Sequence, residues 1–422
     1  MAPRSICYIA ALLLSISATT TATPLENDFV LTEVALDTNA FPVPTNCKAW
    51  ILRMGGVPAQ NIEFWSPPKA DDAVEITEYG RNCTSVHDPI DTDWSGPHEI
   101  VVPKIDISAF FCEPLKPNPD PNARRIVQLL VHGATHNKWA WHGLSRYQQY
   151  NWAYILAKEG YYTLAIDLFG HGNSSFIPGT KYTAKPQFPD PITDIQQPVH
   201  VEIIHNLVHM LRSKTRVKGF GFDKVVYVGH GLGAQIGIHF QRKYPEDCDA
   251  IVVTGYHDTG LRPAFEKWNF TPSALTGQDE YKDRPLGYLK GTNSSGRESI
   301  MFAHNYDPRL PQLDFELQDT LTIGEACWPG IMTPVPNWKK KVLWVAGEYD
   351  DQVCPYSGNK KAYQYCKKRL EDRCKRLFPH GECSVWLVQN SGHAWMLHRE
   401  VTKAQQKGIK TVAKVDWPGF NL

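Results

Sequence analysis

The sequence predicts an α/β fold, in which a mostly parallel sheet carries helices on both faces. The first observation is that short apolar runs alternate with longer helical segments from residue 126 almost to the C-terminus. This alternation is typical of parallel strands joined by helical crossovers. The second is that glycine-rich and polar segments directly follow several of the apolar runs. Ligands bind at the carboxyl ends of strands in such sheets, so these segments are the candidates for function.

Size and charge narrow the class of protein. The chain has 422 residues, of which 42% are hydrophobic, and this is enough for one large core or two modest ones. Its 44 basic and 44 acidic residues give a formal net charge of zero. Nothing in this balance favours a nucleic acid or an anionic membrane as partner, so we expect a small-molecule substrate.

The N-terminus has the pattern of a secretory signal. Arg4 precedes an apolar run over residues 6–16, and the small residues Thr20, Thr21 and Ala22 come next. The alternative is a membrane anchor, but this run is too short to span a bilayer and no later run is long enough. We therefore expect residues 1–22 to be a signal peptide, the protein to be secreted, and no transmembrane segment.

Sequons and cysteines agree with export. Asn82, Asn269 and Asn293 stand in N-x-S/T sequons and are predicted glycosylation sites. Of the ten cysteines, Cys7 would leave with the signal, and the nine that remain predict disulfides with one cysteine unpaired or paired between chains. The connectivity stays open. No CxxC pair occurs, which argues against a zinc site, and we expect no metal.

The part before residue 95 is predicted to be an N-terminal extension with the first strands. Residues 23 to about 75 are rich in proline and show no period, so we expect irregular structure there. Between residues 74 and 112, runs such as the one at residues 99–102 favour strands and an antiparallel start to the sheet.

The core is predicted over residues 95–256 and 336–422. Each expected strand is a short apolar run, and each expected helix is a longer segment between two such runs. The expected strands cover residues 126–132, 162–167, 224–228, 250–255, 341–346 and 384–389. The expected helices cover about 144–159, 199–213, 232–243, 357–377 and 399–408.

Residues 257–335 interrupt the alternation of expected strands and helices, and they contain prolines, glycines, aromatic residues and polar clusters. An insertion late in such a sheet predicts a cap. Its aromatic residues, among them Trp268 and Phe270, indicate an apolar pocket and hence an apolar substrate. A cap with a small core of its own would contain the same residues, and the sequence leaves both interpretations open.

Five strand ends carry motifs in a recognisable order. The segment His132-Gly133-Ala134 comes first, and residues 167–174 follow the next strand. Residues 229–233, Gly-His-Gly-Leu-Gly, then form a sharp strand-to-helix turn, residues 347–350 end in an aspartate, and residues 390–393 end in a histidine. This order resembles the α/β-hydrolase superfamily. The resemblance covers about residues 95–410 and is strongest to secreted fungal members with a cap.

The resemblance implies a role for each motif. His393 would be the general base and then the general acid, and Asp350 would orient its imidazole. The backbone amides of Ala134 and Leu232 would form the oxyanion hole, and residue 231 would be the nucleophile. The Gly-x-x-Asp spacing favours Asp350 over two other carboxylates, Asp351 and Asp258. His132 and His171 are expected to have structural roles.

Position 231 departs from the family pattern. Gly-x-Ser-x-Gly appears here as Gly229-His230-Gly231-Leu232-Gly233, so the side chain that attacks the carbonyl is absent. Glycine cannot form an acyl-enzyme. It also relaxes the strained turn, so we expect the fold to remain intact. No other serine is placed to substitute, which leaves slow turnover by a water that His393 activates in the space of the missing side chain.

The same glycines also fit the dinucleotide fingerprint G-x-G-x-x-G/A. That motif needs an acidic residue at the end of the next strand. Asp247 and Asp249 precede the strand at 250–255, and Asp258 is too far along the chain. This interpretation would also leave Asp350 and His393 without a role, so we expect no cofactor.

Three functions remain on one fold. The first is an enzyme acting on an ester, lactone or related carbonyl substrate, with weak or non-classical hydrolysis. The second is a secondary-metabolite tailoring enzyme, as in fungi, that uses His393 as a base for cyclisation, elimination or condensation. The third is a non-catalytic binder of a small ligand. A pure binder has little use for a complete histidine–aspartate pair, which favours the first two.

Overall fold

A computed structural model gives the structure of the chain. It describes residues 30–34, 46–64, 66–84, 94–118, 125–145, 147–174, 189–214, 221–256, 262–328, 333–354 and 360–404. The predicted signal at residues 1–22 therefore lies outside the described residues, as does Asp258.

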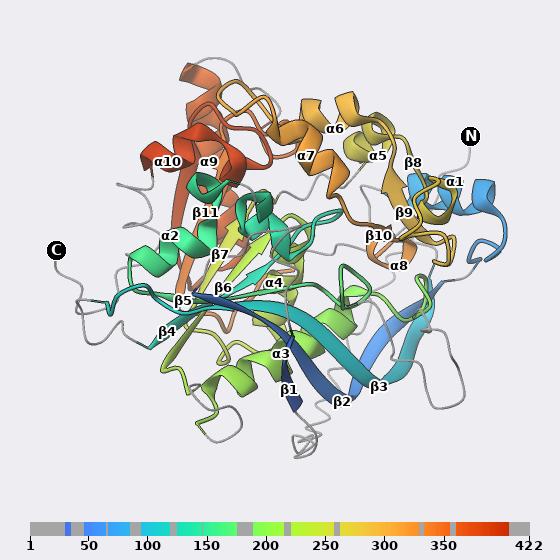
Figure 1. Cartoon of the computed structure of the whole chain (residues 1–422), viewed down its shortest axis with the longest axis horizontal. Helices are drawn as coiled ribbons and strands as arrows, with labels where there is room; N and C mark the ends of the chain where they lie inside the picture. The colour runs from blue at the N-terminus through green and yellow to red at the C-terminus, as the bar shows by residue number, and fades with distance from the viewer. Residues whose placement is uncertain are drawn as a thin grey trace, which may run out of the picture.

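A nine-stranded sheet forms the centre of the molecule, in the order β1-β2-β3-β5-β4-β6-β7-β11-β12 (Figure 1). The pairs from β1 to β5 along this order are antiparallel, and every pair from β5 to β12 is parallel. The strands of this sheet are β1 (Val30–Val34), β2 (Cys47–Phe64), β3 (Trp94–Cys112), β4 (Ile126–Val131), β5 (Tyr162–Ile166), β6 (Lys224–His230), β7 (Ala250–Thr254), β11 (Lys341–Gly347) and β12 (Glu382–Val388).

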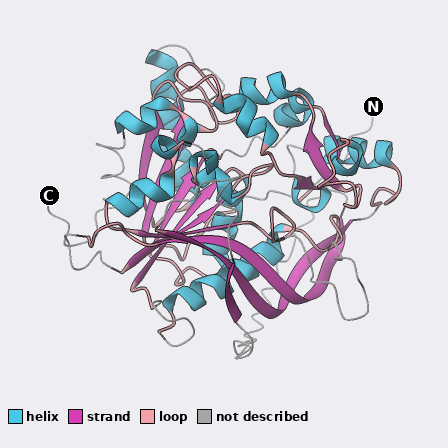
Figure 2. Ribbon diagram, viewed as in Figure 1, coloured by secondary structure: helices cyan, strands magenta, loops and turns pink. Residues whose placement is uncertain are grey.

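Helices lie on both sides of this sheet (Figure 2), which confirms the predicted fold class. The strand β4 is buried along its whole length because both faces of a parallel sheet are covered. That is why such strands appear in the sequence as unbroken apolar runs. The helices around the sheet are α2 (Trp152–Lys158), α3 (Gln197–Arg212), α4 (Leu232–Lys243), α9 (Lys360–Leu377) and α10 (Arg399–Ala404).

Two predictions for the N-terminal part were wrong. The strand β2 runs through a segment expected to be irregular, and it pairs with β3 along nearly its full length. Gly55, Gly56 and Pro58 lie inside this strand and hide its alternation in the sequence. The run after residue 72 is the helix α1 (Ala73–Cys83), where strand-like structure was expected. Asp72 caps it by accepting hydrogen bonds from the amides of residues 74 and 75.

The helix expected at 144–159 is also shorter than predicted. Only α2 within it is α-helical, and short 3₁₀ turns precede it at residues 138–141, 143–145 and 148–150. Leu144 has a φ of 49° and Ser145 a φ of 69°. These left-handed conformations prevent a continuous helix from starting before Trp152.

Residues 262–328 form a layer of their own beside the main sheet (Figure 1). A three-stranded antiparallel sheet in the order β10-β9-β8 lies at its centre. Helix α1 lies against β8 and α8, and a disulfide between Cys83 and Cys327 joins it to this layer. The N-terminal extension thus contributes to the cap. The cap elements are α5 (Arg262–Trp268), β8 (Phe270–Pro272), β9 (Tyr288–Gly291), α6 (Ser294–Met301), α7 (Leu310–Glu316), β10 (Leu321–Thr322) and α8 (Ile323–Ala326).

The cysteines pair as the oxidising-compartment argument predicts. Three further disulfides join Cys47 to Cys112, Cys354 to Cys366, and Cys374 to Cys383. Among the described residues Cys248 is the unpaired cysteine, and it is buried. Burial raises the pKa of its thiol well above the ordinary range, so it behaves as a small apolar side chain.

Candidate active site

Residue 231 stands at a tight bend between β6 and α4. Gly231 has φ 52° and ψ −113°, which is a backbone conformation costly for any residue with a side chain. Its amide donates to the carbonyl of Thr254 on the neighbouring strand at 2.9 Å. Gly233 is required by close packing, because a Cβ there would stand 2.5 Å from the carbonyl oxygen of His132. The strand–glycine–helix turn expected from the sequence is present.

His393 and Asp350 meet at the ends of two adjacent strands. Asp350 follows β11 and His393 follows β12, and these strands pair in parallel register. The Nδ1 atom of His393 lies 2.9 Å from Oδ2 of Asp350, whose side chain is fully buried. Asp351, the neighbouring carboxylate, is exposed to solvent. The structure thus brings together the pair that the spacing favoured.

The other ring nitrogen of His393 faces Gly231. A Cβ built on Gly231 would lie 3.7 Å from Nε2 of His393 and 3.7 Å from Cα of Gly133. Apart from Gly231 and its two neighbours in the chain, no other atom of the described residues would lie within 4 Å of it. Gly231 and Ala134 are both partly accessible. A small space that would admit a Cβ atom in van der Waals contact therefore separates the imidazole from the glycine, at the place where a nucleophile side chain would stand.

Two backbone amides lie beside this space. Ala134 follows β4, and Leu232 is the first residue of α4, directly after the bend. Within the described parts of the chain, neither amide donates a hydrogen bond. Free amides at a strand end and a helix N-terminus are the donors that stabilise an oxyanion.

A sequence profile of the alpha/beta hydrolase family matches residues 128–405, which includes every one of these positions. The chain belongs to the alpha/beta hydrolase family. No curated protein sequence matches the chain.

Solved structures with this fold are similar to it only distantly. A probable hydrolytic enzyme from Pseudomonas aeruginosa is 14% identical with a TM-score of 0.43, and the match covers 74% of this chain and 91% of that one. A monoglyceride lipase from Saccharomyces cerevisiae is 15% identical with a TM-score of 0.47, over 74% and 92%. A thermophilic esterase from Thermogutta terrifontis is 12% identical with a TM-score of 0.39, over 74% and 95%.

The cap holds the loop that contains Ala134. Arg297 on α6 donates from its Nη1 atom to Oγ1 of Thr135 at 2.7 Å, and from Nε to Asp314 at 2.6 Å. The carboxylate of Asp314 also lies 2.9 Å from Nε2 of His136. All four side chains are buried. Burial alone would raise the pKa of Asp314, but the charges of Arg297 and His136 and their hydrogen bonds together outweigh burial and hold the pKa well below the ordinary value.

His398 holds the loop that contains His393. Its Nε2 atom accepts from the amide of Gly392 at 3.1 Å and from that of Ala303 at 3.0 Å, while Nδ1 lies 3.0 Å from the carbonyl of Ala394. Two donors to Nε2 require that the proton sit on Nδ1. Burial lowers the pKa of His398 to about 4, which keeps this ring neutral. No sequence pattern indicated His398 or Arg297, because the contacts of His398 with Ala303 and of Arg297 with Thr135 join segments that are distant in the chain.

Other histidines near the site have structural partners, as predicted for His132 and His171. Nε2 of His132 accepts from the amide of Leu168 at 2.9 Å, and His171 pairs with Glu325 of the cap at 2.9 Å. His230 lies 4.7 Å from His393 between ring centroids. Burial and the charge of His393 lower the pKa of His230 far below its ordinary value, so it adds no cation beside the imidazole.

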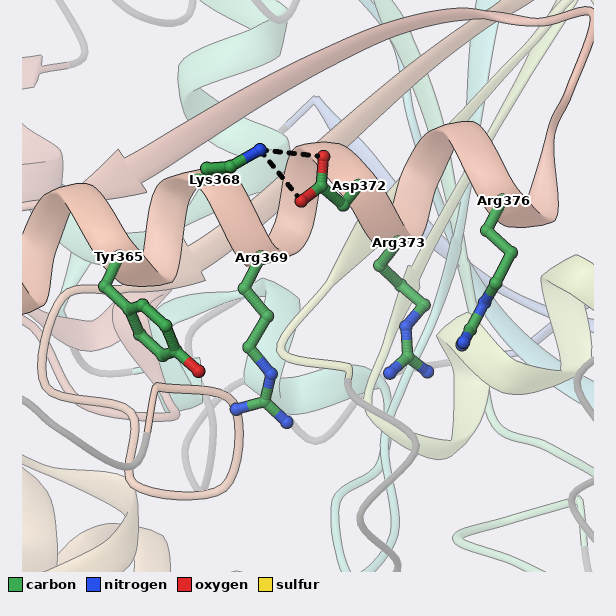
Figure 3. Close-up of a pocket in the computed structure, with 6 residues that line it drawn as sticks. All are labelled: Tyr365, Lys368, Arg369, Asp372, Arg373 and Arg376. Atoms are coloured by element: carbon green, nitrogen blue, oxygen red, sulfur yellow. Dashed lines mark hydrogen bonds and ion pairs between the residues drawn. The ribbon is translucent and has the colours of Figure 1, made fainter.

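A separate hollow of about 310 Å³ lies along α9, and none of the residues described above lines it (Figure 3). The long basic side chains of its wall project from the same helix. With four cationic residues and one acidic residue, it differs chemically from the space beside His393. It is lined by Tyr365, Lys368, Arg369, Asp372, Arg373 and Arg376.

Two remaining predictions concern the surface. The three sequon asparagines Asn82, Asn269 and Asn293 are exposed, and glycosylation stays a prediction. Among the described residues, no helix is long and apolar enough to cross a membrane.

Proposed function

We propose that this alpha/beta hydrolase cleaves a small ester or lactone with water as the direct nucleophile. The observation that carries the proposal is the space between Gly231 and His393. The imidazole, oriented by Asp350, borders this space, and so do Gly231 and Gly133. Leu232 and Ala134 directly follow these two glycines, and neither of their amides donates a hydrogen bond within the described residues. A water in this space would contact the base, and a carbonyl oxygen would contact the amides of Ala134 and Leu232.

The reaction needs a single addition and a single elimination. His393 takes a proton from the water through Nε2 as the water oxygen bonds to the carbonyl carbon. Negative charge forms on the carbonyl oxygen, where the two amides stabilise it. The intermediate then collapses, and the alkoxide leaves with the proton from the imidazolium. Asp350 stabilises that imidazolium throughout.

In the described part of the chain, the two serines nearest to these motifs in sequence do not compete with water as nucleophile. Within the described residues, no hydroxyl is hydrogen-bonded to the ring of His393. Ser391 donates its hydroxyl to the carbonyl of Gln389, and Ser174 donates to the carbonyl of Asp167. Without a covalent intermediate we expect slow turnover, because a serine family that loses its nucleophile keeps only about 10³–10⁴-fold catalysis over water.

Export is part of the proposal. Four disulfides among the described residues are the usual sign of an oxidising compartment, and they support secretion. The substrate would then be an extracellular ester of modest size. The aromatic cap residues Trp268 and Phe270 are buried and pack against each other in the core of the cap, so they do not indicate whether the substrate is apolar.

The test is hydrolysis of a p-nitrophenyl ester by the wild-type protein and by His393→Ala. We expect slow hydrolysis without a burst for the wild type, and the background rate for His393→Ala. The control is His380→Ala, which removes an exposed histidine and should hydrolyse at the wild-type rate. A fluorophosphonate should label none of the three proteins.

Three results would contradict the proposal. Turnover that survives His393→Ala would show that this imidazole is not the base. No turnover of any ester, together with equal binding of a carbonyl ligand by both proteins, would identify a binder. Exchange of a substrate C–H proton without hydrolysis would instead show that His393 acts directly on the substrate.

A further inference from the structure

We propose that His205, His209 and Asp247 bind a divalent transition-metal ion of the Zn²⁺ class. The cluster includes none of the residues proposed for ester cleavage, so the inference does not depend on that function. Their ligand atoms all lie within 4.8 Å of one another. The absence of a CxxC pair led us to expect no metal, but a site built from histidine and aspartate needs no cysteine.

The helix and the turn beside it bring the three side chains together. His205 and His209 are four residues apart on α3, so their side chains lie one above the other on the same face. Asp247 belongs to the turn between α4 and β7. Its Oδ2 atom is 2.6 Å from Nδ1 of His205, and its Oδ1 atom is 3.5 Å from Nε2 of His209.

These distances are close to those of a metal site. Ligands at about 2.0–2.2 Å from a tetrahedral Zn²⁺ lie roughly 3.3–3.5 Å from one another. The distance from Oδ1 of Asp247 to Nε2 of His209 already has this value, while the other carboxylate oxygen, Oδ2, contacts His205. The Asp247–His205 contact is a hydrogen bond that must open by less than about 1 Å for an ion to enter between the two side chains.

The cationic side chains near the cluster pair with other carboxylates, so the carboxylate of Asp247 is available to bind an ion. Its carboxylate pairs only with the two imidazoles in the described part of the chain. The neighbouring acids have their own cations, since Asp249 pairs with Arg212 and Glu202 with Lys243. Two neutral imidazoles and one carboxylate are a ligand set that zinc, copper and nickel prefer.

Supporting contacts hold two of the ligands in place. The ring of Tyr244 stacks on that of His205, with 3.8 Å between centroids. Arg212 donates from Nε and Nη2 to the backbone carbonyl of Asp247, at 3.0 and 2.7 Å. Ligands that are fixed before binding need less ordering when the ion arrives.

The cluster is open to solvent on one side. The side chain of His209 is 49% exposed, whereas those of His205 and Asp247 are 24% and 12% exposed. A metal can therefore enter past His209, and water can complete its coordination. Three protein ligands with an open fourth position are also the pattern of a site that exchanges a ligand.

The experiment is calorimetric titration of tag-free protein with Zn²⁺, followed by Co²⁺ and its visible absorption. We expect one ion per chain on the wild type. His209→Gln keeps a hydrogen-bond donor near Asp247 but loses the imidazole ligand, so the affinity should fall by more than about tenfold. Asp247→Asn should give a comparable loss, and the Co²⁺ bands of a four-coordinate site should disappear.

His380→Ala is the control, because it removes an exposed histidine that belongs to no cluster of metal-binding side chains among the described residues. It should bind Zn²⁺ as the wild type does. Because His209 is half exposed, His209→Gln should fold normally, and circular dichroism checks this. Binding that is unchanged in His209→Gln, or absent from the wild type at millimolar Zn²⁺, would show that the three residues form an ion pair only.

Discussion

The Nε2 atom of His393 lies 3.7 Å from the point that a Cβ atom on Gly231 would occupy. One further bond from that point leads to the place of a seryl oxygen, which would then be within hydrogen-bonding reach of the imidazole. The histidine, its aspartate and the amides already stand in position around it. The proposed site would therefore differ from that of a serine hydrolase by one side chain.

We predict that Gly231→Ser creates a covalent catalyst. The new hydroxyl would donate to Nε2 of His393 and attack the carbonyl in place of water. A fluorophosphonate should label this variant and not the wild type, and hydrolysis of a p-nitrophenyl ester should show a burst of acyl-enzyme formation. Absence of both signals in a folded Gly231→Ser protein would show that residue 231 is not at the nucleophile position.

Gly231→Ala is the matched control for this change. It adds a Cβ at the same positive φ, but no hydroxyl. We expect both variants to lose about 1–3 kcal/mol of unfolding free energy, because a side chain is strained in this conformation. Denaturant titration measures that loss. Labelling of the alanine variant would point to a different nucleophile.

The second prediction separates the two adjacent carboxylates. Asp350→Asn removes the charge that orients His393 and stabilises its protonated form, so the rate of ester hydrolysis should fall by up to about 10⁴-fold. Asp351→Asn changes the exposed neighbour and should leave the rate near that of the wild type. Steady-state hydrolysis by both variants provides the measurement. Equal losses would mean that Asp350 has no special role.

Sequence and structure agree best where a motif lies at a strand end. The positions of such residues follow from the local sequence. An apolar run predicts a strand, and the residues directly after it must lie at the end of that strand. Gly231, Asp350 and His393 could therefore be assigned from their order along the chain, and the structure brings them together.

The contacts that support the site could not be predicted in this way. Arg297 contacts Thr135 across 162 residues of sequence, and no pattern in either segment indicates the partner. The strand β2 was missed because glycine and proline interrupt its alternation of apolar and polar residues. Pairing with β3 nevertheless satisfies the hydrogen bonds of its backbone. Tertiary pairing decides both cases, and a single sequence contains no direct signal of it.

The third prediction concerns Arg297 as a positioning residue. Arg297→Lys keeps the positive charge beside Asp314, but a single ammonium group cannot also hold Thr135 in the same geometry. The loop with Ala134 should then shift, and kcat for ester hydrolysis should fall more than KM rises. The free energy of unfolding should fall by about 1–3 kcal/mol, since a buried acceptor loses its donor.

Arg309→Lys is the control for Arg297. Arg309 also pairs with an aspartate of the cap, Asp307, but it lies on the surface. Its replacement should change neither kcat nor stability measurably. If both lysine variants show the same modest loss of stability and the same kcat as the wild type, the loop does not depend on Arg297.

The last prediction concerns stability at acidic pH. Burial lowers the pKa values of His132 and His398 to about 4, whereas in the unfolded chain they return to about 6.5. Below about pH 6.5 these two imidazoles therefore bind protons in the unfolded state but not in the folded state. The free energy of unfolding should fall as the pH drops from 6.5 to 4, by about 3 kcal/mol for each ring.

His398→Gln tests this assignment, because an amide can accept and donate at the same two positions and does not titrate. Between pH 6.5 and 4.5, its unfolding free energy should depend less on pH than that of the wild type, by about 1.4 kcal/mol per pH unit. This window lies above the region where the buried carboxylates Asp314 and Glu325, with their lowered pKa values, begin to destabilise the fold. Urea titrations at several pH values give both slopes. Parallel curves for the two proteins would mean that His398 is protonated in the folded state, and that it cannot accept both backbone amides that hold the His393 loop.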